Sequence, residues 1–303
     1  MRVAITGSSG FLGSAIVRYF SNHNSEIICL VRSKHGKSGS GNISFIEYKE
    51  SLFTEDVTNK LAKLKPDVFI HCAWNGTAGE CRNEAFQQSY NLPLTLESVH
   101  LAHGSGCKHW IGTGSQAEYG VKTNVITETD STKPLTNYGK AKLSAGTQAL
   151  DLCGQLGIIG AWNRIFSLYG PGDNLNYFIP YVINSLLQKR MPEVTKCEQQ
   201  WDYLYVEDAA DAFYSQCMKQ CVGLFNLCSG NTVTLKSTIE MIQKILDDDS
   251  QIQYGKVPYS ENQIMFLAGD CRRLKEQTGW TPRTSLAKGL KQTINYYRKL
   301  ESN

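Results

Sequence analysis

The chain has 303 residues, and its 31 basic and 28 acidic side chains are mixed throughout. A chain of this length buries a large core and is long for one compact domain, so we expect one domain with a smaller appendage. No basic block or acidic tail favours nucleic acid or a membrane surface as a partner. No apolar run approaches the ~18 residues of a membrane span, and no signal peptide precedes the first predicted strand, so we expect a soluble, cytoplasmic protein.

Ten cysteines are spread along the chain without any Cys-x-x-Cys pair. Several lie in apolar runs, as Cys29 does within residues 27–31 and Cys228 does after residues 225–227. Cysteines in such runs are typical of buried, reduced thiols. We therefore expect neither a disulfide framework nor a metal site.

A glycine-rich turn follows the first predicted strand, residues 2–5, and leads into a helical pattern at residues 14–20. Its three glycines let the backbone turn tightly and approach a pyrophosphate, and the next helix directs its positive N-terminal dipole at that anion. This context predicts a dinucleotide-binding fingerprint. The expected cofactor contacts in it are Gly7, Ser9, Gly10, Phe11, Leu12 and Gly13.

The second predicted strand, residues 26–31, ends at Arg32. In a nucleotide-binding βαβ unit an acidic residue at this place bonds the ribose hydroxyls of NAD, whereas an arginine accepts the 2′-phosphate of NADP. Arg32, assisted by Ser33 and by Lys34 or Lys37, therefore favours NADP(H), with NAD(H) as the alternative cofactor. The competing interpretation is an ordinary surface cation after a strand.

Strands and helices continue to alternate through the first half of the chain. Further strands are predicted at residues 43–48, 67–73 and 109–112, and helices at residues 55–64 and 83–103. This alternation predicts an α/β fold, a Rossmann-type doubly wound parallel sheet with its active site at the carboxyl ends of the strands. His71 and Ser115 fall at such ends. A lone histidine has no triad partner nearby, so we expect His71 to be a backbone-bonded residue beneath the cofactor.

Tyr138 and Lys142 are four residues apart in a predicted helix, so their side chains share one face. At about 4 Å and an effective dielectric of ~20, an ammonium favours a phenolate by about 4 kcal/mol before solvation costs. We therefore expect Lys142 to lower the pKa of Tyr138. A tyrosine tuned in this way exchanges a proton with a substrate oxygen, and Ser115 is placed to bond that oxygen. The spacing alone is a weak signal, because a chain this long contains about one such pair by chance.

These features occur in a longer series of motifs that runs nearly from end to end. The series comprises residues 6–13, 71–73, 90–92, 164–173, 202–208, 225–230 and 278–282, with Ser115, Tyr138 and Lys142 between them. In these motifs the chain resembles an extended short-chain dehydrogenase/reductase of the NAD(P)-dependent epimerase/dehydratase family, whose members act mostly on nucleotide sugars. The resemblance implies a nucleotide-diphosphate sugar as the substrate.

The resemblance also implies roles for individual residues. Ser115, Tyr138 and Lys142 would be catalytic. Further cofactor contacts would come from His71, Cys72, Ala73, Asn91, Tyr138, Lys142 and Ile165. Substrate contacts would come from Trp74, Asn75, Ser115, Gln116, Tyr138, Ser167 and Tyr177.

Two domains are implied by the same resemblance. Residues 1–173 and 201–230 would form the NADP-binding Rossmann domain, and residues 174–200 and 231–303 a smaller, mixed substrate-binding lobe. Within these parts we expect strands at residues 158–166 and 225–228, helices at residues 180–189 and 286–300, and a return of residues 203–221 to the main sheet. Helices at residues 83–103 and 137–153 resemble those that pair in family dimers, so we expect a homodimer.

Three positions depart from the family pattern. The aspartate usual after the third strand is not evident at residues 48–52, Trp201 replaces an arginine, and Ser167 replaces an asparagine. The last two changes lie on the sugar-nucleotide side, so substrate details cannot be copied from relatives.

The residues after Ser115 reduce the number of reactions that we expect the protein to catalyse. Family dehydratases carry an Asp-Glu pair there, whereas this chain has Gln116 and Ala117, which cannot expel water. Relatives that epimerise at C3 and C5 carry a cysteine and a histidine where Ala117 and Tyr177 stand. Glu118 is the one acid nearby, and we do not expect it to contact substrate.

We therefore predict NADPH-dependent reduction of the 4-keto group of a nucleotide-linked 4-keto-6-deoxyhexose, in deoxysugar biosynthesis for surface glycans. Two alternatives stay open. One is a redox-neutral NAD(P)-dependent nucleotide-sugar 4-epimerase, against which Arg32 argues mildly. The other is a non-catalytic NADP-binding scaffold, a class that usually loses the tyrosine or the lysine that this chain retains.

Overall fold

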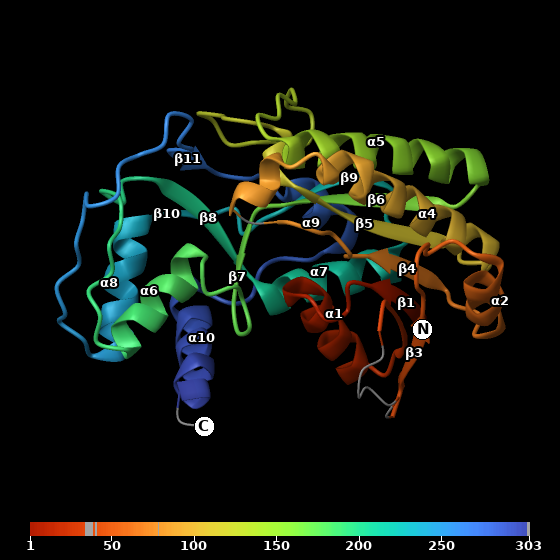
Figure 1. The fold of residues 1–303 in the computed structure, drawn as a ribbon, viewed down its shortest axis with the longest axis horizontal. Coiled ribbons are helices and arrows are strands. Elements are labelled where there is room, and N and C mark those ends of the chain that lie inside the picture. Colours follow the sequence, from red (N-terminus) through yellow and green to blue (C-terminus); the bar gives the residue numbers. More distant parts are fainter. Residues whose placement is uncertain (34–38, 40, 78, 302–303) are drawn as a thin grey trace.

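A computed structural model describes residues 1–33, 39, 41–77 and 79–301 of the chain. A sheet flanked by helices makes up the larger part, and a smaller lobe lies at one end of it (Figure 1). Lys34 and Lys37 lie outside the described residues.

Seven parallel strands form the main sheet in the order β3-β2-β1-β4-β5-β6-β9. Their bounds are β1 Arg2–Thr6, β2 Glu26–Val31, β3 Ile43–Glu47, β4 Val68–His71, β5 His109–Ser115, β6 Ile159–Ile165 and β9 Gly223–Leu227. The chain winds outward from β1 to β3, then crosses back so that β4 pairs with the other edge of β1. The predicted doubly wound sheet is thus confirmed, and the carboxyl ends of β1 and β4 meet at the point where the winding reverses.

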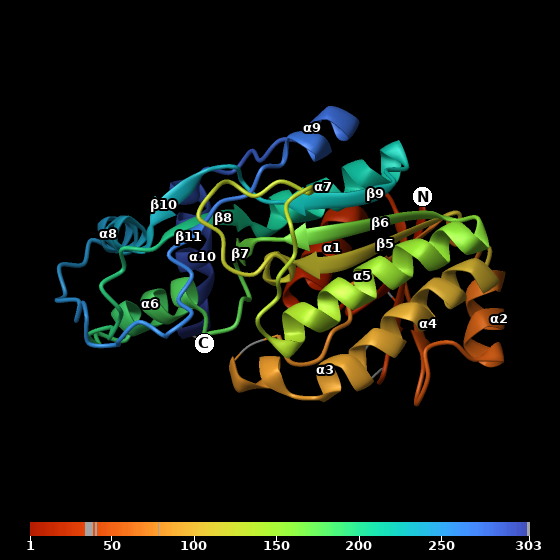
Figure 2. The same ribbon diagram turned by 90° about the horizontal axis from the view of Figure 1, so that it is seen from above.

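Helices cover both faces of this sheet (Figures 1 and 2). One face carries α1 (Phe11–Asn22), α7 (Val206–Lys219) and α9 (Arg272–Thr278), and the other carries α2 (Glu55–Lys63), α4 (Asn91–Gly104) and α5 (Asn137–Leu156). Phe20 and Phe213 fill the first interface, and Trp110 and Trp162 stack in the second. Within the described residues, no helix is long and apolar enough to cross a membrane.

The single helix predicted at residues 83–103 is wrong. The segment contains a 3-10 turn, η1 (Gly79–Asn83), a short helix, α3 (Phe86–Ser89), and then α4. Pro93 explains the break, since it has no N–H to donate to the carbonyl of Ser89 and its ring would collide with that carbonyl in a continuous helix.

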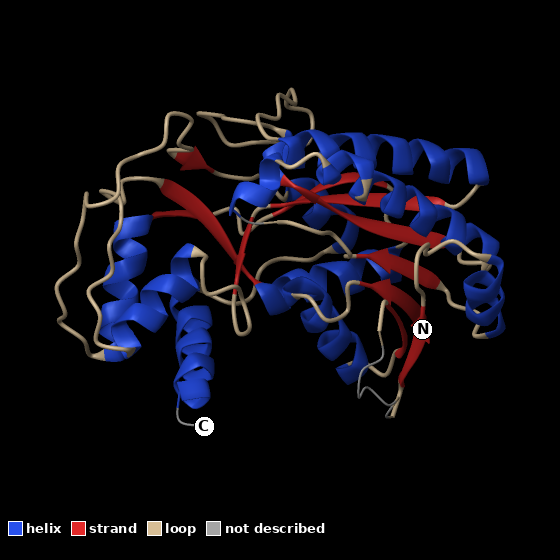
Figure 3. Ribbon diagram, viewed as in Figure 1, coloured by secondary structure: helices blue, strands red, loops and turns tan. Residues whose placement is uncertain are grey.

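The smaller lobe is built on a second sheet, whose central strand is β8 (Gln200–Tyr205). Its other strands are β7 (Ser167–Tyr169), β10 (Thr232–Thr234) and β11 (Phe266–Leu267), and only β10 runs antiparallel to β8. Helices α6 (Phe178–Leu187), α8 (Leu235–Leu246) and α10 (Leu286–Glu301) pack with it around a separate apolar core (Figure 3). The predicted mixed lobe is therefore present.

The expected return of residues 203–205 to the main sheet is wrong. Tyr203 and Tyr205 pair with β7 in the smaller sheet. The reason is that β9 occupies the free edge of β6 along residues 161–165, so no edge is left for β8. The chain rejoins the larger part only at α7, which packs against α1. The exact division into two domains stays a prediction.

Gly146 generates a stability prediction, because α5 packs on β6 through this residue. A Cβ added there would lie 2.5 Å from Nε1 of Trp162. Gly146→Ala should lower the free energy of unfolding, measured by urea denaturation, by about 1–3 kcal/mol, the usual cost of overpacking. The matched control is Gly154→Ala in the same helix, where the Cβ meets nothing within 4 Å. That variant should be neutral or up to about 1 kcal/mol more stable, and equal losses in both variants would contradict the packing account.

Candidate active site

The turn between β1 and α1 accepts only glycine at its two closest contacts. Gly7 has a φ of +69°, and a Cβ there would lie 2.6 Å from the backbone nitrogen of Ala73. A Cβ on Gly13 would collide with the carbonyl of Gly7. These contacts bring the start of α1 against the carboxyl ends of β1 and β4. The result is an open helix N-terminus beside a backbone cradle, which suits a pyrophosphate.

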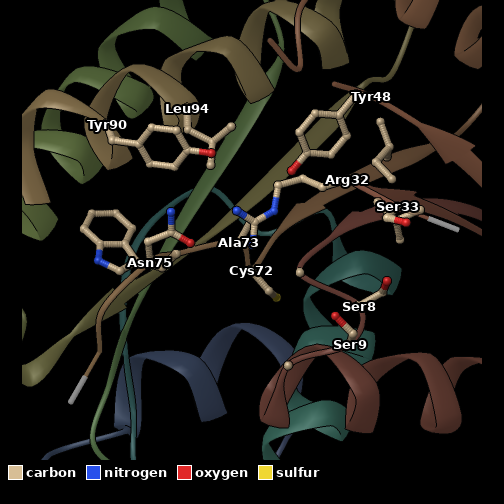
Figure 4. A pocket seen from close by; sticks show the side chains of 15 residues that line it. Ser8, Ser9, Arg32, Ser33, Tyr48, Cys72, Ala73, Asn75, Tyr90 and Leu94 are labelled. Atoms are coloured by element: carbon tan, nitrogen blue, oxygen red, sulfur yellow. The ribbon is translucent and has the colours of Figure 1, made fainter. Parts of the chain in front are cut away.

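A cavity of about 440 Å³ lies beside this cradle (Figure 4). It brings together nine of the predicted cofactor or substrate residues, namely Gly7, Ser9, Gly10, Arg32, Ser33, Cys72, Ala73, Trp74 and Asn75. It also contains residues that the sequence analysis missed, among them Ser8, Tyr48, Tyr90 and Leu94. Tyr48 directly follows β3, where the expected aspartate is absent, and this position was the available signal.

Arg32 points into the middle of the cavity, below the hydroxyl of Tyr48 (Figure 4). Burial raises the pKa of Tyr48, and the positive charge of Arg32 opposes that rise. Arg32 is exposed, but it also lines the cavity and is close enough to act on groups inside it. Its role as a cofactor contact stays a prediction.

His71 is held by hydroxyl groups and not by the backbone, so that part of its prediction is wrong. Its Nδ1 lies 2.9 Å from the hydroxyl oxygen of Thr6, and its Nε2 lies 3.3 Å from that of Thr95. Burial lowers the pKa of His71 to about 3, with a smaller contribution from Lys142. A fully buried, neutral imidazole between two threonines supports the sheet below the cavity and is not available as an acid or base.

The segment after β4 is fixed from behind by two buried amides. The Asn91 side chain accepts from the backbone nitrogen of Asn75 at 2.9 Å and donates to its carbonyl at 3.0 Å. Gln87 accepts from the indole nitrogen of Trp74 at 2.8 Å. Since Asn91 is fully buried, it positions the lining residue Asn75 and does not itself line the cavity. Phe11, Leu12, Gly13, His71 and Ile165 also lie outside the cavity lining.

Ser115 and Tyr138 meet at the ends of two elements. Ser115 is the last residue of β5, and Tyr138 lies in the first turn of α5, whose N-cap Thr136 accepts from the backbone of Gly139 at 3.1 Å. The Ser115 hydroxyl is close enough to the Tyr138 phenol to lower its pKa. A substrate oxygen placed between these hydroxyls would find a hydrogen-bond donor and a proton source together.

Lys142, the third residue of the predicted triad, is engaged mainly by groups other than Tyr138. Its Nζ donates to the carbonyl of Thr113 at 2.6 Å and lies 3.6 Å from the ring centroid of Trp74. Burial lowers the pKa of Lys142 to about 7. Burial also raises the pKa of Tyr138, and the opposing influences are Arg82 and then Ser115. Lys142 is not among these main influences, and its expected effect on the pKa of Tyr138 stays a prediction.

Glu118 is fully buried behind Ser115. One carboxylate oxygen accepts from the backbone nitrogen of Ser115 at 2.9 Å and from the indole of Trp162 at 3.0 Å. The other accepts from Arg164 at 2.7 Å in a buried ion pair. With these three donors, the carboxylate has a structural role and connects β5 with β6.

The remaining predicted substrate residues lie around the Ser115 end of the sheet. Oε1 of Gln116 is buried and has no hydrogen-bond partner among the described residues. Tyr177 precedes α6 in the smaller lobe, and its hydroxyl lies 3.3 Å from that of Thr77 across from it. Ser167 begins β7, two residues after Ile165, which is in register with Ser115. No group of three or more metal-ligating side chains exists in the described part of the chain.

The buried amine of Lys142 generates a pH prediction. Its pKa is about 7 in the fold against an ordinary value of 10.5, so between these values the unfolded chain binds more protons. The free energy of unfolding of the wild type therefore rises with pH between these two pKa values. Below the lower value, the cost of burying a protonated Lys142 is present in full. Lys142→Met lacks this dependence. Its unfolding free energy relative to wild type should fall by on the order of 2 kcal/mol as the pH is raised from about 6 to about 9.

The control for this measurement is Lys140→Met, which removes an exposed lysine from the same helix. Its difference from wild type should stay constant over the same pH range. If the Lys142→Met difference is equally constant, the amine is not buried as the structure has it.

A model of the NAD dependent epimerase/dehydratase family matches residues 3–223. Among curated proteins, the chain is 23% identical to a dTDP-glucose 4,6-dehydratase of Haemophilus influenzae, over 98% of both chains. It is also 23% identical to UDP-glucuronic acid decarboxylase 1 of Arabidopsis thaliana, over 98% of this chain and 70% of the relative.

Solved structures share the fold over the full chain. The structure of UDP-glucose 4-epimerase from Thermotoga maritima with UDP-glucose has a TM-score of 0.85 at 23% identity, covering 99% of this chain and 100% of that one. The dTDP-glucose 4,6-dehydratase of Bacillus anthracis in complex with NAD has a TM-score of 0.83 at 21% identity, covering 100% and 98%. Since the family model spans most of the chain and the cradle and triad lie within that span, the protein belongs to the NAD dependent epimerase/dehydratase family.

Proposed function

We propose that the protein uses NADPH to reduce the 4-keto group of a nucleotide-linked 4-keto-6-deoxyhexose. The observation that carries this proposal is that hydroxyl groups are available beside Ser115 whereas, among the residues that the structure describes, a free acid or base is not. The Ser115 hydroxyl lies near the Tyr138 phenol and lowers the pKa of that phenol, so both groups can act on one substrate oxygen, while the nearby acid Glu118 is buried in an ion pair. The names of relatives that act on UDP-linked and dTDP-linked sugars support a nucleotide sugar as the substrate class.

The residues present fit a dinucleotide. The cradle at Gly7 and Gly13, which a Cβ would fill, would hold its pyrophosphate, and the cavity lined by Arg32, Ala73 and Asn75 would hold its adenosine half. When bound, NADPH supplies a hydride to the ketone carbon. Negative charge then grows on the ketone oxygen, where Ser115 donates a hydrogen bond and Tyr138 transfers its proton.

Dehydration and enolisation both require an acid or base beside the sugar. Gln116 carries no titratable proton, and Ala117 carries no functional group. Glu118 cannot take their place, because Ser115, Trp162 and Arg164 all donate to its buried carboxylate. This difference separates the chain from the dehydratases that it resembles in sequence.

The position of Arg32 in the cavity supports NADPH over NADH. Arg32→Asp should raise the KM for NADPH tenfold or more, since a charge-assisted contact is worth about 1.5–3 kcal/mol. The KM for NADH, measured with the same sugar substrate, should change far less. Arg190→Asp removes an exposed arginine three residues beyond α6 and should leave both constants unchanged. Equal effects of Arg32→Asp on the two cofactors would overturn the assignment.

The reaction itself is tested with a panel of nucleotide 4-keto-6-deoxysugars and NADPH in deuterated water. Simple reduction should oxidise the cofactor and leave the ring carbons C3 and C5 unlabelled and uninverted by NMR. Deuterium at C3 or C5 that depends on the enzyme would show enolisation and defeat the proposal. Turnover without net loss of NADPH, by a protein that keeps its cofactor through purification, would instead indicate the redox-neutral 4-epimerase.

A further inference from the structure

Arg82 is a half-buried cation over the ring of the proposed proton donor. Its guanidinium carbon lies 4.4 Å from the ring centroid of Tyr138. The Lys142 amine lies 5.9 Å from the same centroid and is engaged by the Thr113 carbonyl and the Trp74 ring. Arg82 is therefore the nearer of the two cations to Tyr138. A guanidinium also stays charged at every pH at which a protein folds.

The segment that carries Arg82 is fixed on both sides of it. Gln87 donates to the carbonyl of Cys81 at 2.8 Å, and Asn137 donates to the carbonyl of Asn83 at 2.6 Å. Asn137 is the first residue of α5 and directly precedes Tyr138. The hydrogen bonds thus tie the backbone around Arg82 to the helix end that carries the phenol, and the position of the cation over the ring is built into the fold.

No carboxylate competes for this cation. The ion pairs among the described residues join other side chains, and none of them includes Arg82. A half-buried guanidinium that forms no ion pair can act on the neighbouring aromatic ring without direct compensation by a bound carboxylate.

We propose that Arg82 is a positioning residue that favours the ionised form of Tyr138 and so sets the pH range over which Tyr138 donates its proton. This inference rests on the proposed role of Tyr138 in the reduction. The phenol is also near Ser115 of β5, Glu118 of η2 (Gln116–Glu118), Lys142 of α5 and Tyr177 before α6.

The electrostatic balance at Tyr138 agrees with this role. Burial is the largest influence and raises the pKa of Tyr138, and Arg82 is the strongest influence that lowers it, ahead of Ser115. Burial lowers the pKa of Lys142 itself to about 7, so that amine is partly neutral near this pH. Arg82 thus adds a permanent positive charge beside Tyr138.

The kinetic test is the pH profile of the reduction in Arg82→Gln. The alkaline limb, on which Tyr138 loses its proton, should move up by about one pH unit, the scale expected when an opposite charge at this distance is removed. Arg82→Lys keeps a cation and should recover at least half of that shift. The control is Lys140→Gln, which removes an exposed charge from α5 two residues from Tyr138 and should not move the limb.

A rise in KM without any movement of the limb would overturn the proposal, since Arg82 would then be a substrate contact. A lower rate with an unmoved limb would overturn it too, because that is the result of a purely structural role.

A second measurement does not depend on turnover. The full-length protein is labelled at the tyrosine ring carbons, and the Tyr138 resonance is identified by its loss in Tyr138→Phe. Tyr138 should ionise at a lower pH in wild type than in Arg82→Gln. If it ionises over the same pH range in both proteins, the inference about Arg82 fails. If the resonance shifts as expected but no ketosugar is reduced, only the proposed function fails.

Discussion

The buried carboxylate of Glu118 is the interaction on which the geometry of the site depends. It receives the backbone of Ser115, the indole of Trp162 and the guanidinium of Arg164, and so joins the end of β5 to β6. A buried charge is costly unless it is paired and fully hydrogen-bonded, and removing one partner of such a pair typically costs about 3–5 kcal/mol. The contacts that satisfy this charge also hold Ser115 in place, and they leave the carboxylate unable to act as a catalytic acid or base.

The contacts of Glu118 are connected to the rest of the site through Trp162 and α5. Trp162 lies between Glu118 and Gly146, so the close approach of α5 to β6 is coupled to the position of Ser115. The N-cap of α5 then sets Tyr138 beside that serine, and η1 is tied to the same helix end through Asn137. Arg82 reaches the phenol only because each of these contacts is fixed.

Local patterns in the sequence predicted much of this fold. Alternating apolar segments and the glycine spacing identified the strands of the main sheet and the cradle, because both depend on neighbouring residues. A single helix was predicted at residues 83–103, although Pro93 was a local signal for the break before α4. The pairing of β8 with β7 could not be predicted from local patterns, because it depends on which strand edges distant parts of the chain leave free. The ion pair of Glu118 joins residues 46 positions apart, and the contact of Arg82 with Tyr138 depends on a loop whose course no local pattern specifies.

In the proposed reaction, the hydroxyls of Ser115 and Tyr138 serve a single hydride transfer to C4, with no other change to the sugar. Its most direct test uses NADPH that carries deuterium at the transferred position of its nicotinamide, with a nucleotide 4-keto-6-deoxysugar as the acceptor. The account predicts one NADP⁺ formed for each deuterium found in the product, with all of the label at C4. A product that carries no deuterium while the NADPH stays unconsumed would contradict it.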